Sequence, residues 1–382
     1  MKGKYIALIV AGALLVGGVI VGVAAASSYA FNMNNMFSKE DTKLQLEERI
    51  VELSDSFKNI KVSDAQIRFV PSGDGKTSVD VFETSKYTFD VDVTGDTLNI
   101  KGNDKGGWMD MVFNFGEGPH VIVNLAESDY EDIFVDNGSG SIKVEKGFSF
   151  KTADLETGSG SIQFTADVAG KTSLVSGSGS VKMSDSQTGE LNAKAGSGSV
   201  SATGIKCADF SFVSGSGLVN VEKLEGNKGF LKSGSGSNKI SDIKADSLTV
   251  EDSSGSVNIE NAQIDGDVDL TDGSGSIKVS KMNASNIKAK GSSGSVRFID
   301  VIAANGFIAE SGSGSVTLEA CDGLDISLKT SSGSIHATLL TPKEISASSG
   351  SGSVKTPELV AGEKNGILNA NAGSGSVKIE YV

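Results

Sequence analysis

Length, composition and charge narrow the class of protein before any motif is considered. The chain has 382 residues, with 48 glycines, two cysteines and a formal net charge of −14. An acidic balance argues against general nucleic-acid binding, which needs a basic surface. Apolar residues make up 38% of the chain and recur at regular spacing, which excludes a disordered glycine-rich polymer.

The first 30 residues predict a membrane anchor. Lys2 and Lys4 precede an uncharged run over residues 6–26, long enough as a helix to span roughly 30 Å. Positive residues stay on the cytoplasmic side, so we expect residues 1–5 in the cytoplasm, a transmembrane helix over 6–26, and an extracellular remainder. The alternative is a cleaved signal peptide, whose apolar region is usually only about 7–15 residues long. In either case the bulk of the chain is exported.

A linker with a short amphipathic helix is expected over residues 27–58. Leu46, Ile50, Leu53 and Phe57 recur at steps of 4, 3 and 4, which is the spacing of one helical face. We expect the helix to begin near residue 39 and its apolar face to cap the next domain. Its polar face is mostly acidic, which disfavours a position on a membrane surface.

Residues 59–137 form an N-terminal β-strand region in which the first coils of a repeat are expected. Apolar residues alternate, as in Ile60 and Val62 or Phe89 and Val91, and turns fall at 73–75 and 95–96. The length of this region corresponds to about four additional coils.

Residues 138–382 consist of thirteen units with a Gly-Ser-Gly-Ser corner or a close variant of it. The spacing is 19 or 20 residues, except for a last interval of 23. The second glycine of each corner, here called the corner glycine, indexes the units: Gly140, Gly160, Gly179, Gly198, Gly217, Gly236, Gly255, Gly275, Gly294, Gly314, Gly333, Gly352 and Gly375.

The columns of this alignment predict two strands that point the same face inward, one on each side of the corner. The residue two after the corner glycine is Val or Ile in twelve units, with Asn238 as the exception, and the residue five before it is apolar in all. A unit this small cannot bury its own face, so copies must stack with each strand about 4.8 Å from its copy. We therefore predict an all-β fold, a single-stranded β-solenoid resembling a β-helix, about 60 Å long over these units.

The cysteines fit this geometry as core residues. Cys207 and Cys321 lie about six coils apart, or roughly 28 Å along the axis. A disulfide needs Cα atoms within about 7 Å, so we expect both thiols to be free.

The recurring Gly-Ser-Gly-Ser-Val-x-Val unit, with its lead-in at Ile60, Val62 and Phe69, resembles the bacterial family called domain of unknown function 4097 (DUF4097). The resemblance covers about residues 57–382. It implies a β-strand-repeat domain at a Gram-positive cell envelope, of a kind often labelled an adhesin and sometimes linked to envelope stress. The sequence departs from the pattern at Leu218, in place of the second serine, and at Asn238. A Leu-Pro-x-Thr-Gly wall-sorting signal is absent from the sequence, so the predicted N-terminal helix would hold the chain at the cell membrane.

Catalytic and metal-binding patterns are lacking in the sequence, so we expect no enzyme activity, no cofactor and no metal site. Gly-Lys-Thr at 75–77 and 170–172 lacks the earlier glycine of a phosphate-binding loop. His120 and His336 are too isolated to form a zinc site. Polysaccharide-cleaving β-helices need converging carboxylates or basic clusters, and this possibility stays open as a minor alternative.

One outward-facing column, three residues after the corner glycine, is not neutral. Seven of its thirteen members are basic and none is acidic, although Lys and Arg are only 34 of 382 residues, so that about one would be expected by chance. The members are Lys143, Gln163, Lys182, Ser201, Asn220, Lys239, Asn258, Lys278, Arg297, Thr317, His336, Lys355 and Lys378. Either these lysines keep solvent-facing strands from aggregating, or they bind an anionic polymer such as teichoic acid.

The sequence thus predicts a non-enzymatic, membrane-anchored and surface-exposed adhesin-like β-solenoid. Its ligand would lie in the cell envelope or on a host surface, as a wall polymer or a surface protein, and not be a nucleic acid. One alternative is an extracytoplasmic regulator that contacts an envelope-stress sensor in the membrane, and the other is a carbohydrate-active enzyme. The oligomeric state stays open.

Overall fold

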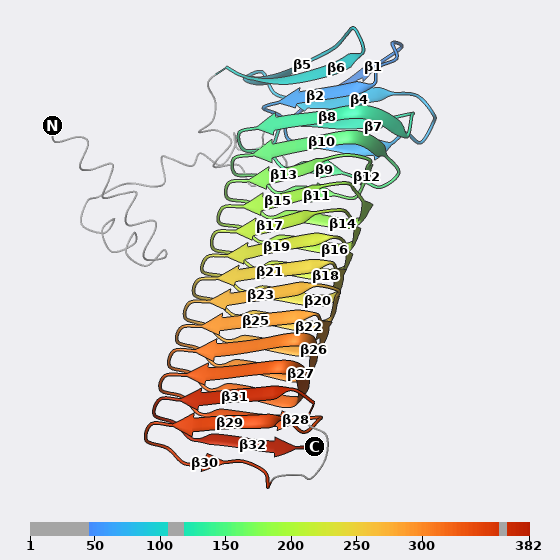
Figure 1. The fold of residues 1–382 in the computed structure, drawn as a ribbon. Helices are drawn as coiled ribbons and strands as arrows, with labels where there is room; N and C mark the ends of the chain where they lie inside the picture. Colours follow the sequence, from blue (N-terminus) through green and yellow to red (C-terminus); the bar gives the residue numbers. More distant parts are fainter. Residues whose placement is uncertain (1–45, 106–117, 359–364) are drawn as a thin grey trace, which may run out of the picture. The chain divides into compact units, whose positions relative to one another are not determined.

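The computed structural model describes residues 46–105, 118–358 and 365–382, which contain strands and turns but no helix. Apart from Gly118 they belong to one of the two compact units of the chain. All their strands join one continuous hydrogen-bonded sheet that winds into a stack of coils (Figure 1). The predicted all-β solenoid is confirmed.

A regular coil has a first strand before its corner and a second strand after it. The first strands are β8 (Asp129–Asn137), β10 (Ser149–Thr157), β13 (Thr172–Ser176), β15 (Leu191–Ala195), β17 (Phe210–Ser214), β19 (Lys228–Ser233), β21 (Ser247–Asp252), β23 (Asp267–Asp272) and β25 (Asn286–Gly291). The second strands are β9 (Ile142–Val144), β11 (Ile162–Phe164), β14 (Val181–Gln187), β16 (Val200–Lys206), β18 (Val219–Glu225), β20 (Asn238–Ala245), β22 (Val257–Ile264) and β24 (Ile277–Ala284).

Two longer strands, β26 (Val296–Ser311) and β27 (Val316–Thr330), each serve as the second strand of one coil and the first strand of the next. The short β12 (Asp167–Val168) pairs with β10. Pairing between coils is parallel and in register, so that Val181 lies opposite Val200 and Val200 opposite Val219. The inward columns predicted from the sequence are buried along the stack, except that Val354 is exposed and Ala347 is only partly buried.

The second strands bend six residues after the corner glycine, which the sequence analysis did not predict. Eight residues at this position have positive φ: Asp185, Gly204, Lys223, Asp242, Asn261, Lys281, Asp300 and Ala320. Four of them are Asp or Asn, which tolerate this conformation better than most side chains. The bend shifts the alternation by one residue, so that Val181 and Met183 point inward before it and Ser186 and Thr188 after it. The bend therefore divides the second strand into two segments that lie on different faces of the coil.

The N-terminal end combines coils with antiparallel strands. Its strands are β1 (Glu47–Glu52), β2 (Asn59–Ser63), β3 (Ile67–Pro71), β4 (Ser78–Glu83), β5 (Tyr87–Thr94), β6 (Thr97–Asp104) and β7 (His120–Leu125). The coil of β2 and β3 lies between that of β6 and β7 and that of β8 and β9, all in parallel. On the outer side β5 runs antiparallel to β6, and β4 antiparallel to both β7 and β1. Two coils and an antiparallel cap therefore replace the four coils expected.

The helix expected within residues 39–58 is wrong where the structure describes it, because Glu47–Glu52 is strand β1. Antiparallel pairing with β4 satisfies the hydrogen-bonding groups of an otherwise open sheet edge, which a helix could cover but not pair with. Val51 and Leu53, two positions apart, pack against the core, whereas Ile50 is 61% exposed. The helical spacing was therefore fortuitous, and tertiary pairing overrode it.

The C-terminal end also departs from sequence order. Its strands are β28 (Ile335–Leu339), β29 (Glu344–Ser349), β30 (Val354–Lys355), β31 (Ile367–Ala372) and β32 (Val377–Tyr381). The last coil, β31 with β32, pairs with β27 and β28 on one side and with β29 and β30 on the other. The preceding coil of the sequence is thus the outermost one, as Figure 1 shows.

A buried ammonium group joins the segments of this C-terminal rearrangement. Lys343 Nζ lies 2.6 Å from Asp322 Oδ1 and 2.8 Å from Thr341 Oγ1, and it also donates to the carbonyl of Asn365. The backbone N–H of Lys343 donates to the hydroxyl of Tyr381. One residue thereby connects β27, the loop before β29, the loop before β31, and β32.

The predicted tail over 1–5, the anchor over 6–26 and the linker up to residue 45 lie outside the described residues. Within the described ranges, no helix has the length and apolarity needed to cross a membrane. Both cysteines are described and both thiols are free, with Cys321 buried and Cys207 partly buried, as predicted.

Candidate binding surface

The thirteen residues that follow each corner glycine by three positions, here called the basic column, form a straight ladder. Each stands outward between two buried residues, as Lys182 stands between Val181 and Met183, except Lys355, whose neighbours Val354 and Thr356 are exposed. The ladder is in register, with Lys182 opposite both Gln163 and Ser201. Its side chains therefore recur at the strand spacing of about 4.8 Å.

At both ends of the basic column, the order of the residues in the stack differs from their order in the sequence. At the C-terminal end the stack runs His336, Lys378, Lys355, because the last coil is inserted before the preceding one. At the N-terminal end Arg68 lies opposite Lys143 and extends the column by one coil. Sequence indexing missed Arg68 because a corner glycine does not precede it, although its neighbours Ile67 and Phe69 alternate as the repeat does.

Glutamates two positions after a member of the column neutralise part of it, either on the same coil, as for Lys143 and Lys378, or on the next coil, as for Arg297. Lys143 Nζ lies 3.1 Å from Glu145, an Arg297 nitrogen 2.7 Å from Glu319, and Lys378 Nζ 2.7 Å from Glu380. Partial burial opposes ionisation of Glu145, but hydrogen bonds from Arg68 and Lys143 outweigh it and lower the pKa of Glu145. The hydrogen bond from Lys378 lowers the pKa of Glu380.

Three lysines in the middle of the column keep their charge available. Lys182, Lys239 and Lys278 form no ion pair with any residue in the described ranges. Lys278 lies directly opposite Arg297, so two cations stand on adjacent coils, although the ion pair with Glu319 offsets part of the charge of Arg297. Like charges at this spacing repel one another, and an anion that lies across them would relieve that repulsion.

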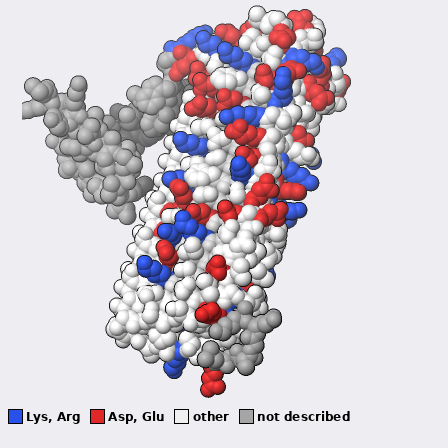
Figure 2. Space-filling view, viewed as in Figure 1, with Lys and Arg blue, Asp and Glu red and all other residues white. Residues whose placement is uncertain are grey.

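The other wall of the solenoid carries charges of both signs. Its outward residues lie on the strands nearest the viewer in Figure 1, and Figure 2 shows Lys, Arg, Asp and Glu intermixed there. Ion pairs connect neighbouring coils, such as Lys232 with Glu251 at 2.7 Å and Lys290 with Glu310 at 3.4 Å. This wall therefore lacks the one-sign column found after the corner.

The serines beside the basic column serve the fold. The hydroxyl of the serine after a corner glycine accepts the backbone N–H of its copy in the next coil, as Ser161 Oγ does from Ser180 at 3.1 Å. Most donors in this serine ladder are therefore backbone N–H groups. Leu218 has no hydroxyl and interrupts the ladder, although its own N–H donates to Ser199 Oγ.

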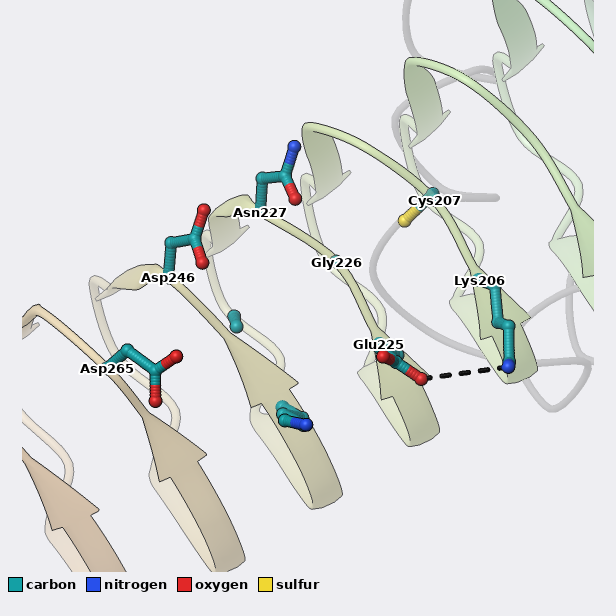
Figure 3. Close-up of a pocket in the computed structure, with 9 residues that line it drawn as sticks. Lys206, Cys207, Glu225, Gly226, Asn227, Asp246 and Asp265 are labelled. Atoms are coloured by element: carbon teal, nitrogen blue, oxygen red, sulfur yellow. Dashed lines mark ion pairs between the residues drawn. The ribbon is translucent and has the colours of Figure 1, made fainter.

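A shallow depression lies at the opposite bend of the coils (Figure 3). Its volume is about 390 Å³, and it forms because the stacked residues Cys207, Gly226 and Ala245 are small. Lys206 and Glu225 form an ion pair of 3.8 Å across its rim. Burial, followed by the charge of Asp209, raises the pKa of Cys207 to about 12, so its thiol is not a nucleophile at neutral pH.

The described residues offer few groups that could bind a metal ion or catalyse a reaction. No group of three or more His, Cys, Asp or Glu side chains is placed there to hold a metal ion. His120 and His336 lie at opposite ends of the stack, on β7 and β28. The arrangement is suited to repeated shallow contacts with an extended ligand.

Two solved structures are distantly similar to the chain. A candidate adhesin from Bacteroides fragilis is 10% identical, with 88% of this chain and 98% of that chain covered and a TM-score of 0.27. A candidate cell adhesion protein from Clostridium sporogenes is 12% identical, with coverages of 88% and 100% and a TM-score of 0.15. No curated protein shows significant sequence similarity to the chain. The model of the Toastrack DUF4097 family matches residues 58–192, 171–297 and 281–382, and the chain belongs to this family.

Proposed function

We propose that this chain is a non-enzymatic, adhesin-like protein of the cell envelope whose basic column binds an anionic polymer of teichoic-acid type. One observation carries the proposal: the column holds seven basic residues and no acidic one in a chain of net charge −14. The residues proposed to bind are Lys143, Lys182, Lys239, Lys278, Arg297, Lys355 and Lys378.

The geometry of the ladder favours a linear ligand over a small one. A rigid stack presents cations at multiples of about 4.8 Å along one line, and each contact is weak because the side chains are exposed. A polymer that carries a phosphate on each repeat could contact several coils at once. The summed contacts would then give useful affinity by multivalency, as no single shallow site could.

The proposal requires the solenoid to face the cell wall. The expected anchor over residues 6–26 would hold it at the outer side of the membrane, and the acidic remainder of the surface would limit contact with the polymer to the column. Lysine acts here as a point charge, so binding should weaken steeply with salt.

The proposal is tested with a fourfold charge reversal, in which Lys182, Lys239, Lys278 and Arg297 are replaced by Glu. A matched variant reverses Lys194, Lys232, Lys288 and Lys290 on the other wall, which changes the net charge equally. Binding of the full-length chain to purified wall teichoic acid is measured at low salt. The column variant should lose about a thousandfold in affinity or more, since each of the four cations near an anionic polymer contributes about 1 kcal/mol and tenfold in affinity corresponds to about 1.4 kcal/mol, and the control variant should lose much less.

Equal losses in the two variants would show that net charge, and not the column, determines binding. Undiminished binding by the column variant would refute the proposed site. Absence of any affinity in the wild-type chain would refute the proposed ligand and direct the search to a protein partner.

A further inference from the structure

A second column, on the inner side of the stack, is polar. It consists of the residue three before each corner glycine and is here called the inner polar column: Asn137, Thr157, Ser176, Ala195, Ser214, Ser233, Asp252, Asp272, Gly291, Ser311, Thr330, Ser349 and Ala372. Polar side chains at this depth require hydrogen-bond partners. The two carboxyl members, Asp252 and Asp272, form hydrogen bonds that differ from those of the hydroxyl members.

The hydroxyl members of the inner polar column all form the same hydrogen bond. All seven donate to the carbonyl of the corner glycine in an adjacent coil, for example Ser311 to Gly294 at 2.9 Å. Four also accept the N–H of their own corner glycine, as Ser311 does from Gly314 at 2.9 Å. A hydroxyl both accepts and donates, so it joins two coils.

Asp252 satisfies the same position with the help of Asn238. One carboxyl oxygen accepts the N–H groups of Ser254 and Gly255, at 3.1 and 2.7 Å. The other accepts the side-chain amide of Asn238 at 3.1 Å. Asn238 is the one polar residue in an otherwise apolar column of the repeat, and this bond accounts for it. Burial raises the pKa of Asp252, and the bonds from Gly255, Ser254 and Asn238 oppose this rise by stabilising the carboxylate.

Asp272 on the next coil lacks such a partner. Its Oδ1 accepts the N–H of Gly275 at 2.7 Å, but its Oδ2 has no hydrogen-bond partner although the side chain is fully buried. A methyl group placed on Gly275 would lie 3.0 Å from this Oδ2 and 1.4 Å from the carbonyl oxygen of Gly255. The unpartnered oxygen and that carbonyl thus border the same small space, and two acceptors cannot bond without a proton between them.

We propose that Asp272 is a proton-binding site: a proton on Oδ2 lets its carboxyl group donate to the Gly255 carbonyl, as the hydroxyls of the column do. Deprotonation removes that donor and leaves a buried negative charge beside a carbonyl oxygen and beside Asp252. The contact between the two coils therefore tightens in acid and loosens in alkali.

The surroundings of Asp272 favour the protonated form. On β21 its register partner is Asp252, on β25 it is the uncharged Gly291, and Asn238 on β20 is neutral. Burial, followed by the charge of Asp252, raises the pKa of Asp272 from 3.8 to about 6 despite the opposing bonds from backbone N–H groups. Because the pKa of Asp272 is higher in the folded than in the unfolded state, its protonation stabilises the fold. This contribution is fully present below about pH 4 and is lost as the pH rises through about 6.

Hydrogen exchange of the full-length chain tests the proposal locally. Protection of the amides in residues 252–277, corrected for intrinsic exchange, should fall by up to about a hundredfold between pH 4 and pH 8, which is the ratio implied by a shift of about two pKa units. The corner at Ser311 in the same molecule is the internal control and should not change in this way. Asp272→Ser, which installs the hydroxyl of the other coils, should abolish the pH dependence.

Infrared spectroscopy provides a readout that needs no variant. The wild-type chain should show the carbonyl band of a buried protonated carboxyl at pH 5, and the band should disappear as the pH rises through about 6. Absence of this band at pH 5 would overturn the proposal, as would a pH dependence that persists in Asp272→Ser. A change in protection on adding a chelator at constant pH would assign the site to a metal cation and would also overturn it.

Discussion

The middle of the solenoid and its two ends obey different rules. In the middle each coil pairs with the next one in the sequence, whereas at both ends one coil is inserted out of order. The coil of β2 and β3 enters between two later coils, and the coil of β31 and β32 enters between two earlier ones. The repeat therefore determines how a coil pairs but not which coil is its neighbour.

The end coils differ from the middle coils because each end coil has a neighbour on one side only. An end coil exposes an unpaired strand edge and an open core, which invite aggregation. At the N-terminal end β1, β4 and β5 cover this edge with antiparallel strands. At the C-terminal end the insertion pairs the terminal strands on both sides, and the buried Lys343 fastens the rearranged loops.

The largest expected effect comes from the middle. A Cβ on Gly179 would lie 2.0 Å from the carbonyl oxygen of Gly160, which is backbone and cannot move without parting the coils. Gly179→Ala should therefore cost about 4 kcal/mol or more and unfold the neighbouring coils. Gly73 lies in a turn of the N-terminal end with no atom within 4 Å of its Cβ position. Gly73→Ala should change stability by less than about 0.5 kcal/mol in the same denaturant titration.

The next effect concerns the C-terminal end. Lys343→Met removes the cation beside Asp322 and leaves a largely buried carboxylate uncompensated, at a cost of about 3 kcal/mol. Limited proteolysis should then cleave the last coils while the middle resists. Lys239→Met, on the exposed basic column, is the control and should leave the proteolytic pattern unchanged. Uniform destabilisation of the whole stack would contradict a local role for Lys343.

A smaller effect tests the serine ladder of the middle. Leu218→Ser restores the missing hydroxyl and removes an apolar side chain that is 37% exposed, so it should stabilise by about 0.5–1 kcal/mol. Ser199→Ala removes the acceptor of the Leu218 N–H and should destabilise by a similar amount. Thermal unfolding of the two variants against wild type gives the sign of each effect. Two changes of the same sign would refute the ladder.

The smallest effect is an opposite pH dependence at the N-terminal end. Burial opposes ionisation of Glu83, but the hydrogen bonds from Arg49 and from the Phe89 N–H outweigh it and lower the pKa of Glu83. Its stabilising contribution is therefore present above the unfolded pKa of about 4.5 and lost as the pH falls through the lower folded value. Exchange in β1 should increase in acid, where exchange around Asp272 decreases. Arg49→Met should remove this acid sensitivity of β1.

The sequence alone predicted the coil but not its exceptions. Strands such as β2, β4 and β6, the inward columns and the free cysteines follow from period-two alternation and from the repeat, and they are confirmed. The rearranged C-terminal end was not predicted: the last interval is 23 residues long, but a spacing cannot show which edge a coil will pair with. Strand β1 resembled a helix, because the open edge that it covers exists only in the folded protein.

The candidate site was predictable to a similar extent. The basic column follows from alignment of the corners, whereas Arg68 belongs to a coil without a corner glycine. The glutamates that neutralise Lys143 and Lys378 lie only two positions further along and could have been read from the same alignment, whereas the partner of Arg297, Glu319, lies on the next coil. The hydrogen bond between Asn238 and Asp252 could not have been predicted from the sequence. The two residues lie on different strands, which approach each other only when the corners are stacked.

A pull-down of the full-length chain on isolated Gram-positive cell walls, with and without their anionic polymers and across a salt series, tests the functional account most directly. If the basic column binds the polymer, the chain should bind only to walls that carry it, and binding should fade as the ionic strength rises. Binding that survives removal of the polymer, or no binding at low salt, would contradict it.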